Sequence, residues 1–239
     1  MRRSLIVKRL RVWLFLFAAL PWLRAWCGES QSKKRPNFVF IFADDWGWGD
    51  LKCYGHPHVK TPNLDRLARE GILFTQFYVN SPVCSPSRAA VMTGCFPARF
   101  GIHGHFATHA LNKRRGMPNW LSPQVPTLTS ILKKAGYVVG HYGKWHLGGG
   151  PGAPQPFAYG IDECKINVGN GPKLQFGPKG RSASSEVIIN ETIAFIERHR
   201  KEPFYVQAWL NDVHATLDPT EEQMRPYENF VPRAVRKKH

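Results

Sequence analysis

The sequence predicts an α/β domain in which a mainly parallel central sheet is flanked by helices on both faces. Residues 37–43 and 204–210 are short, nearly continuous apolar runs, which is the pattern of strands buried on both faces. Between these runs, segments with the period of amphipathic helices alternate with further strand patterns. Such alternation is typical of a parallel sheet whose strands are joined by crossover helices.

The first half of the chain predicts two strands with a helix between them. The first strand covers residues 37–43 (NFVFIFA). The helix begins at Thr61-Pro62, because threonine suits the N-cap and proline the first helical position. Gly71 is a natural end for this helix, and the apolar residues 72–79 (ILFTQFYV) predict a second strand.

The second half of the chain continues the alternation. We expect a helix over 127–135, a strand over 137–142, a long loop rich in glycine and proline over 148–183, a helix over 185–200 and a strand over 204–210. The helical period places one apolar set on one face of each of the three helices: Leu64, Leu67 and Ala68; Leu128, Ile131 and Leu132; and Ile189, Ile193 and Ile196.

The formal net charge of +16 for 239 residues raises the question of a nucleic-acid partner. Much of the excess lies at the two ends of the chain, with six basic residues within 1–24 and four within the last nine positions. The rest forms no basic stripe with interleaved aromatic residues, which is the pattern that tracks a phosphate backbone. We therefore expect no nucleic-acid partner, and the modest positive balance suits a small anionic substrate.

The N-terminus has the pattern of a secretory signal peptide. Basic residues precede an apolar run over 12–23, which is shorter than the roughly 20 residues that span a bilayer. We predict a signal peptide at 1–27, a polar linker at 28–35 and a catalytic region at 36–239. The protein would then be exported, to the periplasm or the medium, or to the lysosome or ER lumen of a eukaryotic cell. The alternative is an uncleaved leader that anchors the protein to a membrane.

Polar side chains follow three of the predicted strands directly. Asp44-Asp45 follows the first strand, Lys144 and His146 follow the strand over 137–142, and His214 follows the last strand. Because ligands bind at the carboxyl ends of parallel strands, we expect these groups to gather at one edge of the sheet. Adjacent carboxylates suit calcium or magnesium, and lysine with histidine along an extended segment supplies a cation and a titratable group on one side. Taken singly, the two carboxylates are more often a solvated turn or a helix cap, and a lysine or histidine is more often a surface side chain or a satisfied polar group of the core.

Cys84 stands in a proline-rich loop ahead of a segment that can form a helix. A nucleophile at a helix N-terminus, with Arg88 four residues on, would sit in a positive field that stabilises an anion. A lone cysteine is otherwise a small buried apolar side chain. The five cysteines include no C-x-x-C pair, which argues against a zinc or thioredoxin-like site.

Two longer segments together resemble the sulfatase family, whose fold is that of the alkaline-phosphatase superfamily. Cys84–Gly94 (CSPSRAAVMTG) resembles the family signature C-x-P-S-R-x-x-x-x-T-G, and Gly136–Gly148 (GYVVGHYGKWHLG) is similar to its second signature. The resemblance extends over about residues 36 to 238. It implies a sulfuric ester hydrolase that acts on a sulfated sugar or an aryl sulfate.

The resemblance also implies how the nucleophile is made. A maturation enzyme that reads Cys-x-Pro-x-Arg would convert Cys84 to formylglycine. One hydroxyl of the hydrated aldehyde would attack sulfur, and the other would drive release of sulfate, which serine cannot do.

For the other site residues, the resemblance implies roles around this nucleophile. A calcium ion, or less readily magnesium, would be bound by Asp44, Asp45 and the modified Cys84. Arg88 would stabilise the formylglycine anion and Lys144 would hold sulfate oxygens. His146 would position or deprotonate the diol, and His214 would lie near the leaving oxygen or a sulfate oxygen.

Two departures from the family pattern leave alternatives open. Cys95 stands where arginine is common, and no Asp-Asn pair occurs to complete the metal shell. Related enzymes are about twice as long, so we expect a truncated, N-terminal portion of the catalytic domain. The alternatives are an inactive remnant that only binds sulfated ligands, and a phosphonate or phosphate monoester hydrolase of the same superfamily. For the His56-Pro-His58 and His103-Gly-His105 pairs we expect ordinary loop roles, with His105 the one candidate for a substrate pocket.

Overall fold

The computed structural model describes residues 35–167, 169, 181–215 and 217–230. The chain divides into two compact units, Met1–Pro36 and Asn37–His239, and every element below belongs to the second. The predicted signal peptide at 1–27 and nearly all of the linker at 28–35 lie outside the described residues, so both stay predictions. Within the described part of the chain, no helix has the length and apolar character to cross a membrane.

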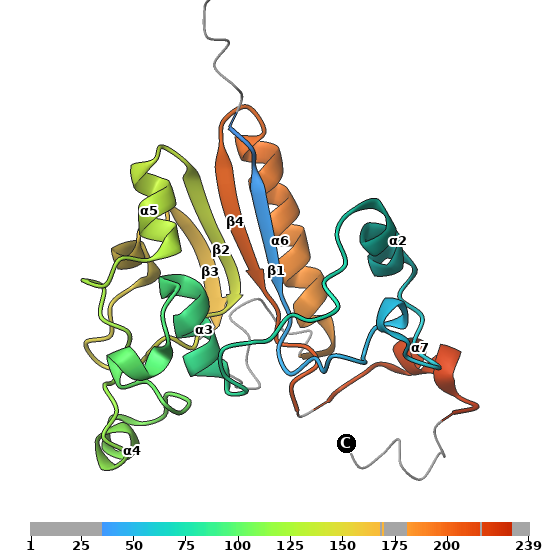
Figure 1. Cartoon of the computed structure of the whole chain (residues 1–239), viewed down its shortest axis with the longest axis horizontal. Coiled ribbons are helices and arrows are strands. Elements are labelled where there is room, and N and C mark those ends of the chain that lie inside the picture. The colour runs from blue at the N-terminus through green and yellow to red at the C-terminus, as the bar shows by residue number, and fades with distance from the viewer. Residues whose placement is uncertain (1–34, 168, 170–180, 216, 231–239) are drawn as a thin grey trace, which may run out of the picture. The chain divides into compact units, whose positions relative to one another are not determined.

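Four parallel strands form one sheet in the order β1-β4-β2-β3 (Figure 1). These strands are β1 (Phe38–Phe42), β2 (Val138–Lys144), β3 (Glu163–Asn167) and β4 (Phe204–Trp209). In the register of the sheet, Trp209 at the end of β4 stands opposite Phe42 of β1 and Gly143 of β2. The carboxyl ends of these three strands therefore lie at one edge, as the polar residues that follow them predicted.

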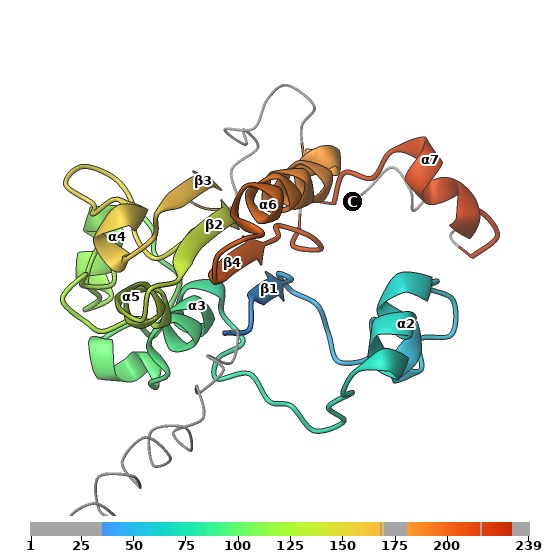
Figure 2. The same cartoon turned by 90° about the horizontal axis from the view of Figure 1, so that it is seen from above.

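Helices cover the sheet on both faces, which confirms the predicted fold class (Figure 2). On one face lies α6 (Ser184–His199), whose Ile188 and Phe195 pack with Val206 and Ala208 of β4. The other face is covered by α3 (Cys84–Thr93) and α5 (Leu128–Lys134). There the larger core cluster joins Met92 of α3 to Val139 and Trp209 of the sheet.

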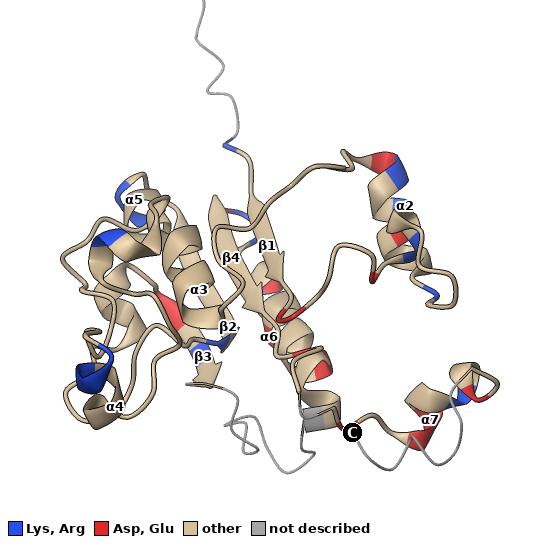
Figure 3. Cartoon of the chain, turned by 60° about the horizontal axis from the view of Figure 1, so that its bottom comes forward, with Lys and Arg blue, Asp and Glu red and all other residues tan. Residues whose placement is uncertain are grey.

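Three further helices lie outside this core. They are α2 (Pro62–Glu70), α4 (His109–Arg114) and α7 (Glu221–Met224). α2 begins with Pro62 at its first position, and the N–H of Gly71 closes it on the carbonyl of Leu67, as predicted. Figure 3 shows the lysines and arginines distributed over α2, α4 and α5, with acidic side chains along α6 and α7.

Two predictions of secondary structure are wrong. Residues 72–79 form no strand, and Ile72, Phe77 and Tyr78 are at least 70% exposed. The apolar pattern matches a strand, but within the described residues no neighbouring strand pairs with it. Conversely, β3 lies inside the predicted loop over 148–183, because its sequence ECKIN is too polar to indicate a strand. As an edge strand, β3 buries only Asn167 fully.

The helical faces are also shifted from the predicted ones. Beyond Ser184, the buried side chains of α6 are Ile188, Thr192 and Phe195, each one position before an isoleucine expected to be buried, and Ile193 is 50% exposed. Leu67 of α2 and Ile131 of α5 are likewise exposed. The apolar residues do recur with a helical period, but the side of the helix that meets the sheet decides which of them are buried.

Candidate active site

The first polar group of the site follows β1. Asp44 is buried, and its main-chain N–H donates a hydrogen bond of 3.0 Å to the carbonyl of Asp212 beyond β4. Asp45 adopts a left-handed backbone with φ of 62°, and its side chain is 52% exposed. The two adjacent carboxylates therefore have different environments, one inside the protein and one at the surface of the site.

Both oxygens of the Asp44 carboxylate contact buried cations. Arg88 Nη2 lies 3.4 Å from Asp44 Oδ1, and the ammonium of Lys144 donates a hydrogen bond to Asp44 Oδ2. The two basic residues are also joined, because Arg88 Nη1 donates to the main-chain oxygen of Lys144 at 3.0 Å. These three residues, which we call the charged cluster, come from α3, from the end of β1 and from the end of β2.

The charged cluster carries two positive charges and one negative charge inside the protein. The Arg88 guanidinium lies over the rings of Trp209 and Phe42, with its carbon 4.9 Å and 5.4 Å from their centroids. Burial lowers the pKa of Arg88 and of Lys144 below their ordinary values, while the Asp44 carboxylate acts in the opposite direction. A positive charge buried without a partner costs free energy, and a neighbouring anion reduces that cost.

Cys84 is the first residue of α3 and lines a cavity with the carboxylates. The cavity has a volume of about 540 Å³, and Asp44, Asp45 and Arg88 share its walls with Cys84. Cys84 is an electrostatic neighbour of Arg88 and Lys144. A side chain there, at the N-terminus of a ten-residue helix, lies where an anion is stabilised.

Ser85, next to the nucleophile position, ties a third segment to the site. The side chain of Ser85 is fully buried, and its hydroxyl accepts a hydrogen bond of 3.0 Å from the N–H of Phe106. The carbonyl of Phe106 in turn lies 3.2 Å from His146 Nε2. The sequence indicated no role for Ser85 beyond its place in the signature, and nothing in the spacing points to Phe106.

The contact with Phe106 decides the state of His146. A carbonyl only accepts, so Nε2 carries the proton and Nδ1 presents a lone pair. Nδ1 is buried and has no hydrogen-bond partner among the described residues. Burial, together with the charge of Lys144, lowers the pKa of His146 to about 4, so the ring is neutral at pH 7.

The predicted alternation of Lys144 and His146 along one extended segment is wrong. β2 ends at Lys144, and His146 has a left-handed backbone with φ of 48°. The two side chains remain electrostatic neighbours. They do so because the chain turns, and not because both stand on one face of a strand.

His214 reaches the site from the segment after β4. Its Nε2 lies 3.6 Å from Asp45 Oδ2, and its side chain is 24% exposed. The structure therefore joins the predicted residues in two contacting groups, the charged cluster and the Asp45–His214 pair, with Cys84 on the cavity that Asp44 and Asp45 share.

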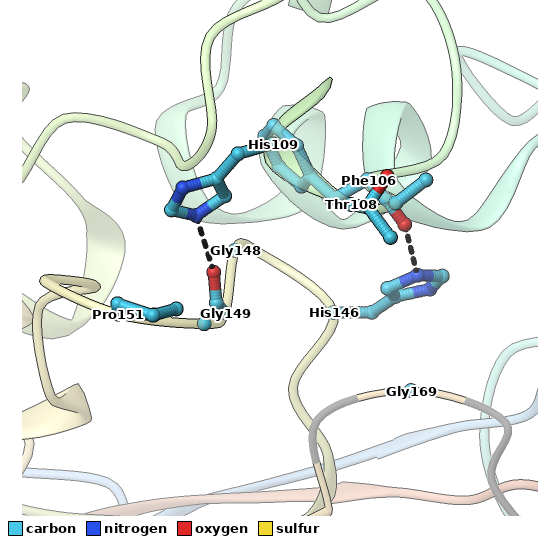
Figure 4. Close-up of a pocket in the computed structure, with 10 residues that line it drawn as sticks. Phe106, Thr108, His109, His146, Gly148, Gly149, Pro151 and Gly169 are labelled. Carbon is cyan, nitrogen blue, oxygen red and sulfur yellow. Dashed lines mark hydrogen bonds between the residues drawn. The ribbon is translucent and has the colours of Figure 1, made fainter. Parts of the chain in front are cut away.

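His146 lines a second cavity (Figure 4). It has a volume of about 630 Å³ and is lined by residues 106–109, His146, 148–151 and Gly169. His109 Nε2 donates to the carbonyl of Gly149 at 3.1 Å and closes one end of this cavity. Sequence reasoning missed His109, because no spacing connects it to a loop 40 residues away.

The paired histidines of the sequence mostly serve their loops, as expected. His56 Nδ1 accepts hydrogen bonds from the N–H groups of His58 and Val59, and His103 Nε2 contacts the carbonyl of Arg115. The ring of His105 lies 6.4 Å from that of His146, but His105 does not line the second cavity.

The described residues include the kind of side chain that binds a divalent cation, but few of them lie together. Carboxylate oxygens are the donors that calcium and magnesium prefer, and Asp44 and Asp45 share one cavity wall with Cys84. Among the described residues, however, no three histidine, cysteine, aspartate or glutamate side chains are grouped as metal ligands.

Comparisons with known proteins agree with this geometry. The family model described as Sulfatase matches residues 36–238. The N-acetylgalactosamine-6-sulfatase of Homo sapiens is 36% identical over 223 residues, which cover 89% of this chain and 41% of that protein. Arylsulfatase A of Homo sapiens is 49% identical over 116 residues, covering 48% of this chain and 22% of that protein.

Among solved structures, Ps i-CgsB in complex with k-i-k-neocarrahexaose superimposes with a TM-score of 0.72 and 26% identity. The superposition covers 84% of this chain and 50% of that one. The chain thus spans at most half the length of these three relatives.

Proposed function

The chain belongs to the sulfatase family, and we propose that it serves the hydrolysis of a sulfuric ester at the cavity that Asp44, Asp45, Cys84 and Arg88 line. The charged cluster carries this proposal. Arg88 and Lys144 share the single carboxylate of Asp44, so the charged cluster itself has an excess positive charge that a sulfate group would balance. Asp45 in the same cavity wall is the carboxylate left to hold a divalent cation.

Cys84 is proposed to act after oxidation to formylglycine. The hydrated aldehyde supplies one hydroxyl that attacks sulfur and a second that allows sulfate to be expelled. Arg88, four residues along α3 and buried against Trp209, holds its positive charge toward the nucleophile position. Lys144, whose ammonium contacts the other oxygen of Asp44, is proposed to hold sulfate oxygens.

His146 is proposed as the proton acceptor. Its Nε2–H is donated to the Phe106 carbonyl, so Nδ1 keeps an unpartnered lone pair, which we propose accepts a proton from a hydroxyl at position 84. A pKa of about 4 keeps the ring neutral over the physiological range, which such a base requires. His214, next to Asp45, is proposed to lie near the leaving oxygen.

Asp44 and Asp45 are proposed to hold a calcium ion together with the oxygen of formylglycine at position 84. When bound, the ion supplies charge stabilisation to the nucleophile and the sulfate. Asp45 is the more exposed carboxylate, whereas Asp44 also balances Arg88 and Lys144.

The printed names of the relatives support a class of substrate. One relative is named for a 6-sulfated N-acetylgalactosamine and another for aryl sulfates, so a sulfated sugar or an aryl sulfate is the proposed ester. A formylglycine-generating enzyme is the proposed maturation partner. The basic and apolar leader supports export from the cytoplasm.

To test the proposal, the full chain is produced together with a formylglycine-generating enzyme, and its modification and activity are measured. Peptide mass spectrometry should find the aldehyde at position 84, and 4-nitrophenyl sulfate should be hydrolysed. Cys84→Ala should abolish turnover, whereas Cys95→Ala, which changes a cysteine beyond the end of α3, should not. An unmodified thiol at position 84, or hydrolysis that survives Cys84→Ala, would contradict the proposal.

A further inference from the structure

The cavity that His146 lines, which we call the glycine-rim cavity, shares no lining residue with the one that Cys84 lines. One wall is formed by residues 106–109, ahead of and into α4, and the opposite wall by residues 148–151 (Figure 4). His146 lies between the two walls and is also an electrostatic neighbour of the charged cluster. A ligand held in this cavity would therefore extend from the site where sulfate is proposed to bind.

The walls of the glycine-rim cavity are fixed by hydrogen bonds on both sides. Ser85 and His146 hold the two backbone groups of Phe106. The buried Asn112 accepts from the N–H of Ala107 and donates to its carbonyl. On the opposite wall, His109 holds the carbonyl of Gly149. The cavity is thus formed in advance of any ligand.

The glycines of the second wall let it approach His109 of the first wall and the neighbouring Trp120. A Cβ atom on Gly150, whose φ is +86°, would lie 3.1 Å from His109 Nε2, and one on Gly148 would lie 2.2 Å from the Cβ of Trp120. With these glycines the cavity keeps about 630 Å³, which falls within the range of roughly 300–1,000 Å³ for small-molecule sites.

The cavity contrasts in charge with the cluster beside it. Among the described residues that line it, none is aspartate, glutamate, lysine or arginine, and the titratable side chains are His109 and His146. His146 is held as the neutral ring by Phe106. A carboxylate or a second sulfate that entered this cavity would lose its water without gaining a lysine or arginine partner among the described side chains of its walls.

We propose that the glycine-rim cavity binds the alcohol part of the ester, that it selects an uncharged ring, and that His109 is a specificity-determining residue. This inference rests on the proposed function, because it assigns the cavity to the leaving group of that reaction. A neutral hexose or other uncharged ring fits the backbone carbonyls, the imidazole faces and Pro151. A uronate of the same size does not.

The experiment compares two ligands that differ only by a carboxylate, methyl β-D-glucopyranoside and methyl β-D-glucuronide. Saturation-transfer NMR on the full chain should give a signal for the glucopyranoside and one about fivefold weaker for the glucuronide. Equal or stronger saturation of the glucuronide, or no signal from either ligand, would overturn the inference. Neither ligand carries sulfate or needs formylglycine, so the result does not depend on turnover.

Variants of two histidines then test the assignment to His109. His109→Ala removes the contact with Gly149 and should weaken the glucopyranoside signal about fivefold. His103→Ala is the matched control, because His103 contacts a loop carbonyl but does not line the cavity. His109→Gln keeps a donor for Gly149 and should retain a folded loop, with a smaller loss of signal. Equal signals from the wild-type, His109→Ala and His103→Ala chains would disprove the role of His109.

The two proposals fail in different ways. If 4-nitrophenyl sulfate is not hydrolysed but the glucopyranoside signal still depends on His109, the proposed function fails and the cavity stands. If sulfate is hydrolysed but the two ligands saturate equally, the selection for an uncharged ring is wrong.

Discussion

Arg88 donates a hydrogen bond of 3.0 Å to the main-chain oxygen of Lys144, and both side chains contact the one carboxylate of Asp44. The residues that meet here are separated by 44 to 100 positions in the chain. They hold the ends of β1 and β2 together through the first turns of α3. The cluster is therefore both the proposed anion site and a structural junction, and its removal has consequences for stability as well as activity.

Asp44→Ala should destabilise the protein by about 3–5 kcal/mol, because it leaves two buried cations without their counter-charge. Urea unfolding at pH 7 measures the change. Glu70→Ala is the control, since the Arg66–Glu70 pair is about two-thirds exposed and should contribute less than about 1 kcal/mol. Equal midpoints for the two variants would show that the cluster is not a structural junction.

Stability should fall as the pH is lowered from about 6.5 to about 4. Burial lowers the pKa of His141 and of His146 to about 4, whereas the unfolded side chains titrate near 6.5. Between these values the unfolded state binds more protons, so each histidine removes about 1.4 kcal/mol per pH unit as the pH falls. Denaturant unfolding at a series of pH values measures this slope.

His199 provides an internal comparison of opposite sign. Burial acts to lower its pKa, but hydrogen bonds to Glu202 and Glu163 raise it above the ordinary value. Its stabilising contribution is therefore present below the unfolded pKa and is lost as the pH rises through the folded pKa. NMR titration of the imidazole carbons should find His199 titrating above 6.5 and His146 near 4. A midpoint of 6.5 for His146 would contradict the proposed neutral base.

Gly143→Ala should destabilise the fold by more than about 3 kcal/mol. Gly143 has a φ of +107°, and a Cβ there would lie 2.0 Å from the carbonyl oxygen of Trp209 on the neighbouring strand. Gly49→Ala is the control, because a Cβ there meets no atom within 4 Å. Thermal unfolding followed by circular dichroism separates the two, and similar melting temperatures would show that β2 and β4 separate to admit the methyl group.

Calcium should raise the melting temperature of the wild-type chain if Asp44 and Asp45 hold the ion, because a ligand that binds only the folded state stabilises it. Asp45→Asn should remove most of this increase. Asp218→Asn, at an exposed position away from the site cavity, should keep it. A shift that is unchanged in Asp45→Asn would place calcium elsewhere.

Sequence signals predicted helix ends well where neighbouring residues in the chain form the cap. Thr127 forms a capping box with Ser130 at the start of α5, and Gly71 closes α2 on Leu67. The same signals failed for residues 72–79, because a strand exists only where another strand pairs with it. They also failed for β3, because at a sheet edge an element forms with only one face in the core.

The sequence by itself determined which chemical groups this protein carries and which strand ends present them. The order of Asp44-Asp45, Cys84 with Arg88, Lys144 with His146, and His214 already indicated one edge of a parallel sheet. Only the tertiary structure decided that Asp44 balances two cations, that Phe106 sets the tautomer of His146 and that His109 closes a second cavity. These are contacts between residues 40 or more positions apart, and such contacts depend on packing, which the spacing of residue types along a chain does not encode.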